Sequence, residues 1–95
     1  MFGQLDGYVQ RMKDVTIYTT NYCPYCRQAE KFLETKGVAF KNIDVTDDQA
    51  MREKLVELSG RQTVPQIFIG EQPIGGYSDM ILLHQKGQLE PLLKA

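Results

Sequence analysis

The sequence predicts an α/β fold in which a four-stranded mixed sheet is flanked by helices. Strand-like and helix-like segments alternate along the 95 residues, and glycines mark many of their boundaries. A helix separates the first two predicted strands, which makes them parallel, whereas a short turn separates the last two, which makes them antiparallel. The apolar fraction of 42% and the charged fraction of 24% are typical of a single globular domain.

Residues 1–13 are expected to form an N-terminal extension to a domain that spans residues 14–95. Apolar residues of the extension recur at helical spacing, which favours a short amphipathic helix, although two glycines weaken its propensity. These apolar positions are Phe2, Leu5, Val9 and Met12.

The first half of the domain predicts a strand, a helix and a second strand. Residues 15–20 are rich in β-branched and aromatic side chains, which favours a strand. Residues 24–36 follow as a helix, because Pro24 suits a first helical turn, apolar residues recur at helical spacing and Gly37 suits a C-terminal end. Residues 38–45 alternate well enough to form the second strand.

The second half continues the alternation. A helix capped by Thr46 or Asp47 is expected to run to about Ser59, and residues 66–69 form a third strand.

The last elements are short. A turn over residues 70–73 leads to a returning strand around Ile74. A helix over about 79–86 is capped by Ser78 or Asp79, and a final helical turn or two ends the chain.

Composition argues against several classes of function. Lys and Arg total 11 and Asp and Glu total 12, so the net charge of -1 leaves no basic excess for a nucleic-acid partner. Apolar runs are only a few residues long, whereas a transmembrane helix needs about 20, so no membrane partner is expected. Residues 1–14 lack the apolar stretch of a signal peptide, so we expect a cytoplasmic protein.

The two cysteines, Cys23 and Cys26, lie three residues apart. A disulfide between them closes a very small loop and stabilises a fold little, so chemistry explains the pair better than stability. Inert thiols and half of a metal site are the alternative interpretations. A tetrahedral site usually needs about four ligands, and the chain adds only His84 to the cysteines, so a redox dithiol is favoured and no metal is expected.

The position of the pair gives each sulfur a role. Cys23 falls just before the first turn of the predicted helix, where free N–H groups and the helix dipole stabilise a thiolate. Cys26 lies one turn inside the helix and closer to the interior. We therefore expect Cys23 to attack a disulfide and Cys26 to resolve the mixed disulfide that forms.

Three short motifs resemble those of the glutaredoxin family, the glutathione-dependent branch of the thioredoxin superfamily. They are CPYC at 23–26 after a strand, TVP at 63–65 before a strand, and GGYSD at 75–79 at the start of a helix. The similarity covers about residues 14–95.

This resemblance implies a thioredoxin-like fold and an enzyme, a glutathione-dependent thiol–disulfide oxidoreductase. Its substrates would be protein–glutathione mixed disulfides and protein disulfides. Glutathione would act as cosubstrate with no bound cofactor. Independently of the resemblance, we expect a monomer.

The resemblance also implies which residues act, with Cys23 and Cys26 catalytic. The main chain of Val64, beside a cis Pro65, would pair with the cysteinyl part of glutathione. The full set implied to contact glutathione is Tyr25, Gln62, Thr63, Val64, Pro65, Gly76, Ser78 and Asp79.

Two charged ends of glutathione would be bound at opposite ends of the site. Asp79 would pair with the γ-glutamyl ammonium at a helix N-terminus, and Arg61 and Gln62 would meet the glycine carboxylate. From the residues alone, the same positions are also explained by helix capping and by solvated loop residues.

One departure from the family pattern is Thr20, where many relatives carry Lys or Arg three residues before the first cysteine. Arg61 is a candidate to replace part of that charge. Two alternative functions remain open: a glutaredoxin-like electron carrier reduced by thioredoxin reductase, and a non-catalytic iron–sulfur cluster carrier shared between two chains.

Overall fold

The computed structural model describes residues 12–94. Most of the predicted N-terminal extension, with its expected short helix, therefore lies outside the described residues. The elements are β1 (Val15–Thr19), α2 (Pro24–Thr35), β2 (Lys41–Asp44), α3 (Gln49–Ser59), β3 (Gln66–Ile69), β4 (Gln72–Gly75), α4 (Tyr77–Gln85) and α5 (Leu89–Leu93).

The four strands form one mixed sheet in the order β2-β1-β3-β4. β1 is parallel to β2 and antiparallel to β3, and β3 is antiparallel to β4. Ile17 of the central β1 lies opposite Asn42 on one side and Ile67 on the other. The predicted fold class is confirmed.

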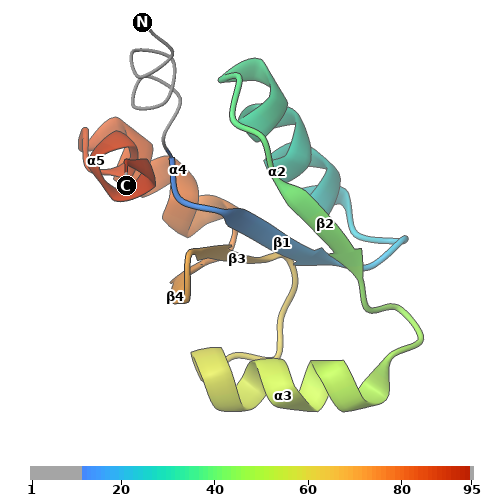
Figure 1. Ribbon diagram of the computed structural model, residues 1–95. Helices are drawn as coiled ribbons and strands as arrows, with labels where there is room; N and C mark the ends of the chain where they lie inside the picture. Colours follow the sequence, from blue (N-terminus) through green and yellow to red (C-terminus); the bar gives the residue numbers. More distant parts are fainter. Residues whose placement is uncertain (1–11, 95) are drawn as a thin grey trace, which may run out of the picture.

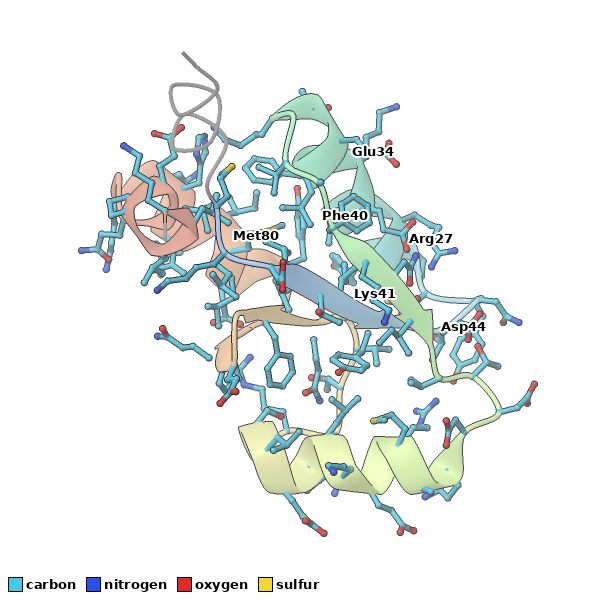
Figure 2. All side chains as sticks on the ribbon, in the orientation of Figure 1. Arg27, Glu34, Phe40, Lys41, Asp44 and Met80 are labelled. Atoms are coloured by element: carbon cyan, nitrogen blue, oxygen red, sulfur yellow. The ribbon has the colours of Figure 1, made fainter. Side chains whose placement is uncertain are left out.

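Helices cover both faces of this sheet. Figure 1 shows α3 on one face and α2 and α4 on the other. The main core lies on the face of α2 and α4, where Ile17, Leu33 and Met80 are at most 1% exposed. Figure 2 shows Met80 between α4 and the sheet and Arg27 on the outer side of α2. Within residues 12–94, no helix is both long and apolar enough to cross a lipid bilayer.

The second strand is shorter than its sequence predicts. β2 covers Lys41–Asp44, whereas residues 38–40 are irregular. Val38 is buried in the core after the turn that ends α2, and its N–H donates to the Leu33 carbonyl at 2.9 Å. The apolar pattern at 38–40 therefore reflects packing under a loop, not strand pairing.

The caps of two helices were predicted wrongly. Asp48, not Thr46 or Asp47, caps α3, and its carboxylate accepts the N–H of Met51 at 3.0 Å. The Thr46 hydroxyl is engaged elsewhere: its oxygen accepts the Asn21 N–H at 2.8 Å, and its proton is donated to Asp44 at 2.6 Å.

At α4 the cap is Gly76, not Ser78 or Asp79. Both of those residues lie inside the first turn, and Asp79 reaches back to accept the Gly76 N–H at 2.9 Å. The returning strand β4 also begins earlier than predicted, at Gln72.

Candidate active site

The loop after β1 places Cys23 at the N-terminus of α2. Cys23 is the N-cap residue, and its Sγ accepts the N–H of Cys26 at 3.1 Å. Pro24 occupies the first turn, where its missing N–H costs no helical hydrogen bond. The sulfur of Cys23 therefore takes the place that a serine or aspartate oxygen usually fills at a helix start.

The two thiols differ in exposure. Both are free; Cys23 is partly exposed, whereas Cys26 is fully buried. Burial, followed by the hydrogen bond with Cys23, raises the pKa of the Cys26 thiol to about 12, although the Thr20 backbone and the Arg27 charge act in the opposite direction. Cys26 is consequently protonated at neutral pH and shielded from large reactants, while Cys23 can meet them.

The segment before β3 forms the wall opposite Cys23. The Val64–Pro65 peptide bond is cis, as the resemblance implies. The Val64 carbonyl oxygen lies 3.7 Å from the Sγ of Cys23. This contact brings the TVP motif and the CPYC motif together from positions 41 residues apart.

An open cavity of about 280 Å³ adjoins this wall. Seven of the eight residues implied to bind glutathione line it, and the eighth, Gln62, lines a neighbouring depression against α3. Neither cysteine is among the residues that line this cavity or a larger depression at residues 12–16 and 37–41. Cys23 is joined to the cavity through Val64, which lines it and whose carbonyl oxygen contacts the Cys23 sulfur. The residues that line the 280 Å³ cavity are Tyr25, Arg61, Thr63, Val64, Pro65, Gly76, Tyr77, Ser78 and Asp79.

Tyr77 is a cavity residue that the sequence-based site did not include. Its ring lies 6.2 Å from that of Tyr25, centroid to centroid, with the planes tilted by 32°. Tyr77 is the central residue of the GGYSD motif, so the motif itself was the sequence signal for it. Gly76 beside it brings the chain close to the opposite wall, because a Cβ there would lie 3.4 Å from the Pro65 carbonyl oxygen.

Arg61 and Asp79 form an ion pair at the cavity, with Nη1 2.7 Å from Oδ2. The guanidinium, and then the Gly76 N–H, lower the pKa of Asp79, and the carboxylate in turn raises the pKa of Arg61. Gly75 makes room for this arrangement. Its φ is +111°, and a Cβ there would lie 2.5 Å from Oδ2 of Asp79.

Thr20 stands where many relatives carry a cation, and it is fully buried. Within the described part of the chain its hydroxyl has no hydrogen-bond partner. Arg27 lies nearby and donates to the Thr20 carbonyl at 3.2 Å, while the same nitrogen is 2.9 Å from the Glu30 carboxylate. The described residues hold no group of three or more His, Cys, Asp or Glu side chains placed to bind a metal.

Comparison with known proteins points to one family. The glutaredoxin family model matches residues 15–74. Glutaredoxin 3 of Escherichia coli K12 is 48% identical over 83 residues, which cover 87% of this chain and all of that protein. A glutaredoxin of Pseudomonas aeruginosa is 44% identical over 84 residues, covering 88% of this chain and all of the relative.

Solved structures agree with this family. The solution structure of a glutaredoxin from Brucella melitensis superposes with a TM-score of 0.78 at 46% identity, covering 87% of this chain and 90% of that one. A crystal structure of a buckwheat glutaredoxin–glutathione complex gives a TM-score of 0.80 at 27% identity, covering 95% of this chain and 84% of the other. The fold is thioredoxin-like, and the chain belongs to the glutaredoxin family of glutathione-dependent thiol–disulfide oxidoreductases.

Proposed function

We propose that this chain reduces protein–glutathione mixed disulfides and protein disulfides through Cys23, with glutathione bound in the 280 Å³ cavity. The observation that carries this proposal is the pairing of a partly exposed Cys23 at a helix N-terminus with a fully buried Cys26. The buckwheat glutaredoxin was solved with glutathione, which supports the same ligand here.

Reduction of a mixed disulfide needs only Cys23. Its thiolate attacks the glutathione sulfur, the substrate disulfide breaks, and the substrate sulfur leaves as a thiolate that takes a proton from water. A second glutathione thiolate then attacks the glutathione sulfur held on Cys23. Cys23 leaves as a thiolate, and glutathione disulfide is released, so two electrons have passed from the glutathione pool to the substrate.

Reduction of a protein disulfide also needs Cys26. Cys23 attacks one substrate sulfur and forms a mixed disulfide while the other sulfur leaves. The buried Cys26 then loses its proton as its sulfur attacks Cys23, which releases the second substrate sulfur and closes the Cys23–Cys26 disulfide. Two glutathione molecules return this disulfide to the dithiol form.

Glutathione recognition is assigned to the cavity walls. The Val64 main chain would pair with the cysteinyl backbone as an added strand does, and Tyr25 would flank the ligand. Gly76, Ser78 and Asp79 would receive the γ-glutamyl end at the N-terminus of α4. Thr63 and Pro65 would complete the wall, and Gln62 would reach the ligand from the neighbouring depression.

A coupled assay tests this function. NADPH oxidation is followed with a glutathionylated peptide, once with glutathione and glutathione reductase and once with thioredoxin reductase. We expect turnover only in the first mixture. Turnover in the second alone would favour the thioredoxin-reductase-dependent carrier, and visible absorption bands in anaerobically purified protein would favour the iron–sulfur carrier.

Cellular location and assembly are predictions from the sequence. We expect a cytoplasmic monomer that carries electrons to oxidised proteins in thiol redox homeostasis. Size-exclusion chromatography with light scattering measures the assembly state directly.

A further inference from the structure

Arg61 does not lie where the family resemblance places it. That resemblance gives Arg61 to the glycine end of glutathione and Asp79 to the opposite, γ-glutamyl end. In the structure the two side chains touch, with Nη1 2.7 Å from Oδ2. Both line the same cavity, whereas Gln62, the expected companion of Arg61, lines a separate depression.

The ion pair leaves binding groups free on both partners. Oδ2 of Asp79 accepts from Arg61 and from the Gly76 N–H, and Oδ1 takes no part in either contact. On Arg61 only Nη1 is engaged by the carboxylate, so further N–H donors of the guanidinium stay available. The N–H donors of the Arg61 guanidinium and the Oδ1 acceptor of Asp79 therefore lie side by side at the start of α4.

The charge of this pair decides what it recognises. Arg61 and Asp79 together are neutral, so they favour a ligand group that is itself a neutral pair of charges over a lone anion. The γ-glutamyl end of glutathione carries an α-ammonium and an α-carboxylate on one carbon, whereas the glycine end carries a carboxylate alone. A lone carboxylate would have to compete with Asp79 for the guanidinium.

We propose that Arg61 is a recognition residue for the γ-glutamyl end of glutathione, an inference that rests on the proposed function. Its guanidinium binds the α-carboxylate at the N-terminus of α4, while Asp79 binds the α-ammonium. Arg61 also positions Asp79, because both bonds to Oδ2 hold that carboxylate against the start of the helix.

A simpler alternative is that the ion pair only ties the loop before β3 to α4. The side chains of Arg61 and Asp79 are 50% and 39% exposed, and exposed pairs contribute little to stability. Such a structural tie would affect all substrates alike. The two explanations therefore differ in a measurable way. If Arg61 binds the γ-glutamyl end, its removal slows only substrates that carry that end; if it is a structural tie, its removal slows all substrates equally.

The experiment uses one reporter peptide whose cysteine is disulfide-bonded to glutathione, to γ-glutamylcysteine or to cysteinylglycine. Release of the peptide thiol is followed in single turnovers of the reduced protein. Arg61→Gln should lower the rate constant about tenfold for the first two substrates and leave cysteinylglycine within about twofold of wild type. Arg61→Lys should restore most of the rate, because it keeps the charge.

Lys54→Gln is the control, because Lys54 is an exposed cation on α3 that lines neither the cavity nor the neighbouring depression. A loss with glutathione and cysteinylglycine but not with γ-glutamylcysteine would place Arg61 at the glycine end and overturn the inference. An equal loss with all three substrates, or none with glutathione, would also overturn it. An inactive wild-type protein would instead refute the proposed function, and this is seen before any variant is compared.

Discussion

Two helix N-termini border the same cavity, and they are capped in different ways. At α2 the Cys23 sulfur accepts the Cys26 N–H, and no acidic residue lies in the first turn. At α4 the cap is Gly76, which has no side chain, and Asp79 of the first turn supplies the acceptor.

The difference shows how one structural element serves two purposes. A helix N-terminus stabilises negative charge whatever its source. At α2 the capping acceptor is a sulfur, and a cysteine sulfur is also a nucleophile. At α4 a carboxylate already fills that role and Arg61 balances its charge, which leaves the helix start suited to binding a ligand rather than reacting with it.

The largest expected effect comes from removing the nucleophile at α2. Cys23→Ser keeps a capping oxygen, so the helix should start as before and thermal stability should change little. Reduction of a glutathionylated peptide should fall by roughly a thousandfold or more, because a serine hydroxyl does not exchange with disulfides. A variant that retains substantial turnover in the glutathione-coupled assay would refute the role of Cys23.

Cys26→Ser should separate the two activities. Reduction of mixed disulfides should persist within about threefold of wild type, since that cycle uses Cys23 alone. Reduction of a protein disulfide should be lost, because the substrate stays bound as a mixed disulfide that mass spectrometry detects. Loss of both activities in a variant that is still folded by circular dichroism would contradict this division.

The next largest effect is expected from Gly75→Ala, at the end of β4 just before α4. The added methyl would occupy the place of the Asp79 carboxylate, and the φ of +111° is strained for any side chain. We expect a cost of roughly 2 kcal/mol or more in urea unfolding and a higher KM for glutathione. Gly37→Ala is the control, because φ is +73° there but no atom of residues 12–94 lies within 4 Å of the added Cβ, so its cost should be about 1 kcal/mol with KM unchanged. Equal effects of the two changes would argue against the Asp79 placement.

The smallest effect is the stability that the Arg61–Asp79 pair contributes. Because the pKa of Asp79 is lowered from its ordinary value of 3.8, this contribution is present above that value and is lost as the pH falls through the folded-state pKa. The pair is well exposed, so Asp79→Asn should cost under about 1 kcal/mol at pH 7. Unfolding in urea at several pH values should show the gap between wild type and variant closing below about pH 4, and a gap that persists in acid would contradict the ion-pair origin. Asp47→Asn, on an exposed loop, is the control.

The sheet and most helices were predictable from the sequence because they depend on local patterns. β-Branched and aromatic residues mark β1, and helical spacing after Pro24 marks α2. Helix starts were harder to predict, because several capping residues stand close together and tertiary contacts choose among them. Thr46 does not cap α3, since its hydroxyl oxygen accepts the Asn21 N–H and its proton is donated to Asp44.

The sequence identifies the three motifs that supply the cavity residues. It does not show how the motifs come together, because that depends on the fold. The contact between Arg61 and Asp79 joins residues 18 positions apart, and no local sequence pattern predicts it. Tyr77 lay inside a recognised motif, but its packing against Tyr25 depends on how α2 and α4 meet.

The central claim is that Cys23 is the reactive sulfur and Cys26 the protected one. The most direct measurement treats the reduced protein at pH 7 with less than one equivalent of iodoacetamide and maps the modified cysteine by mass spectrometry. The account predicts modification of Cys23 almost alone, because Cys26 is buried and its pKa is raised to about 12. Modification of Cys26 at a rate equal to or above that of Cys23 would contradict it.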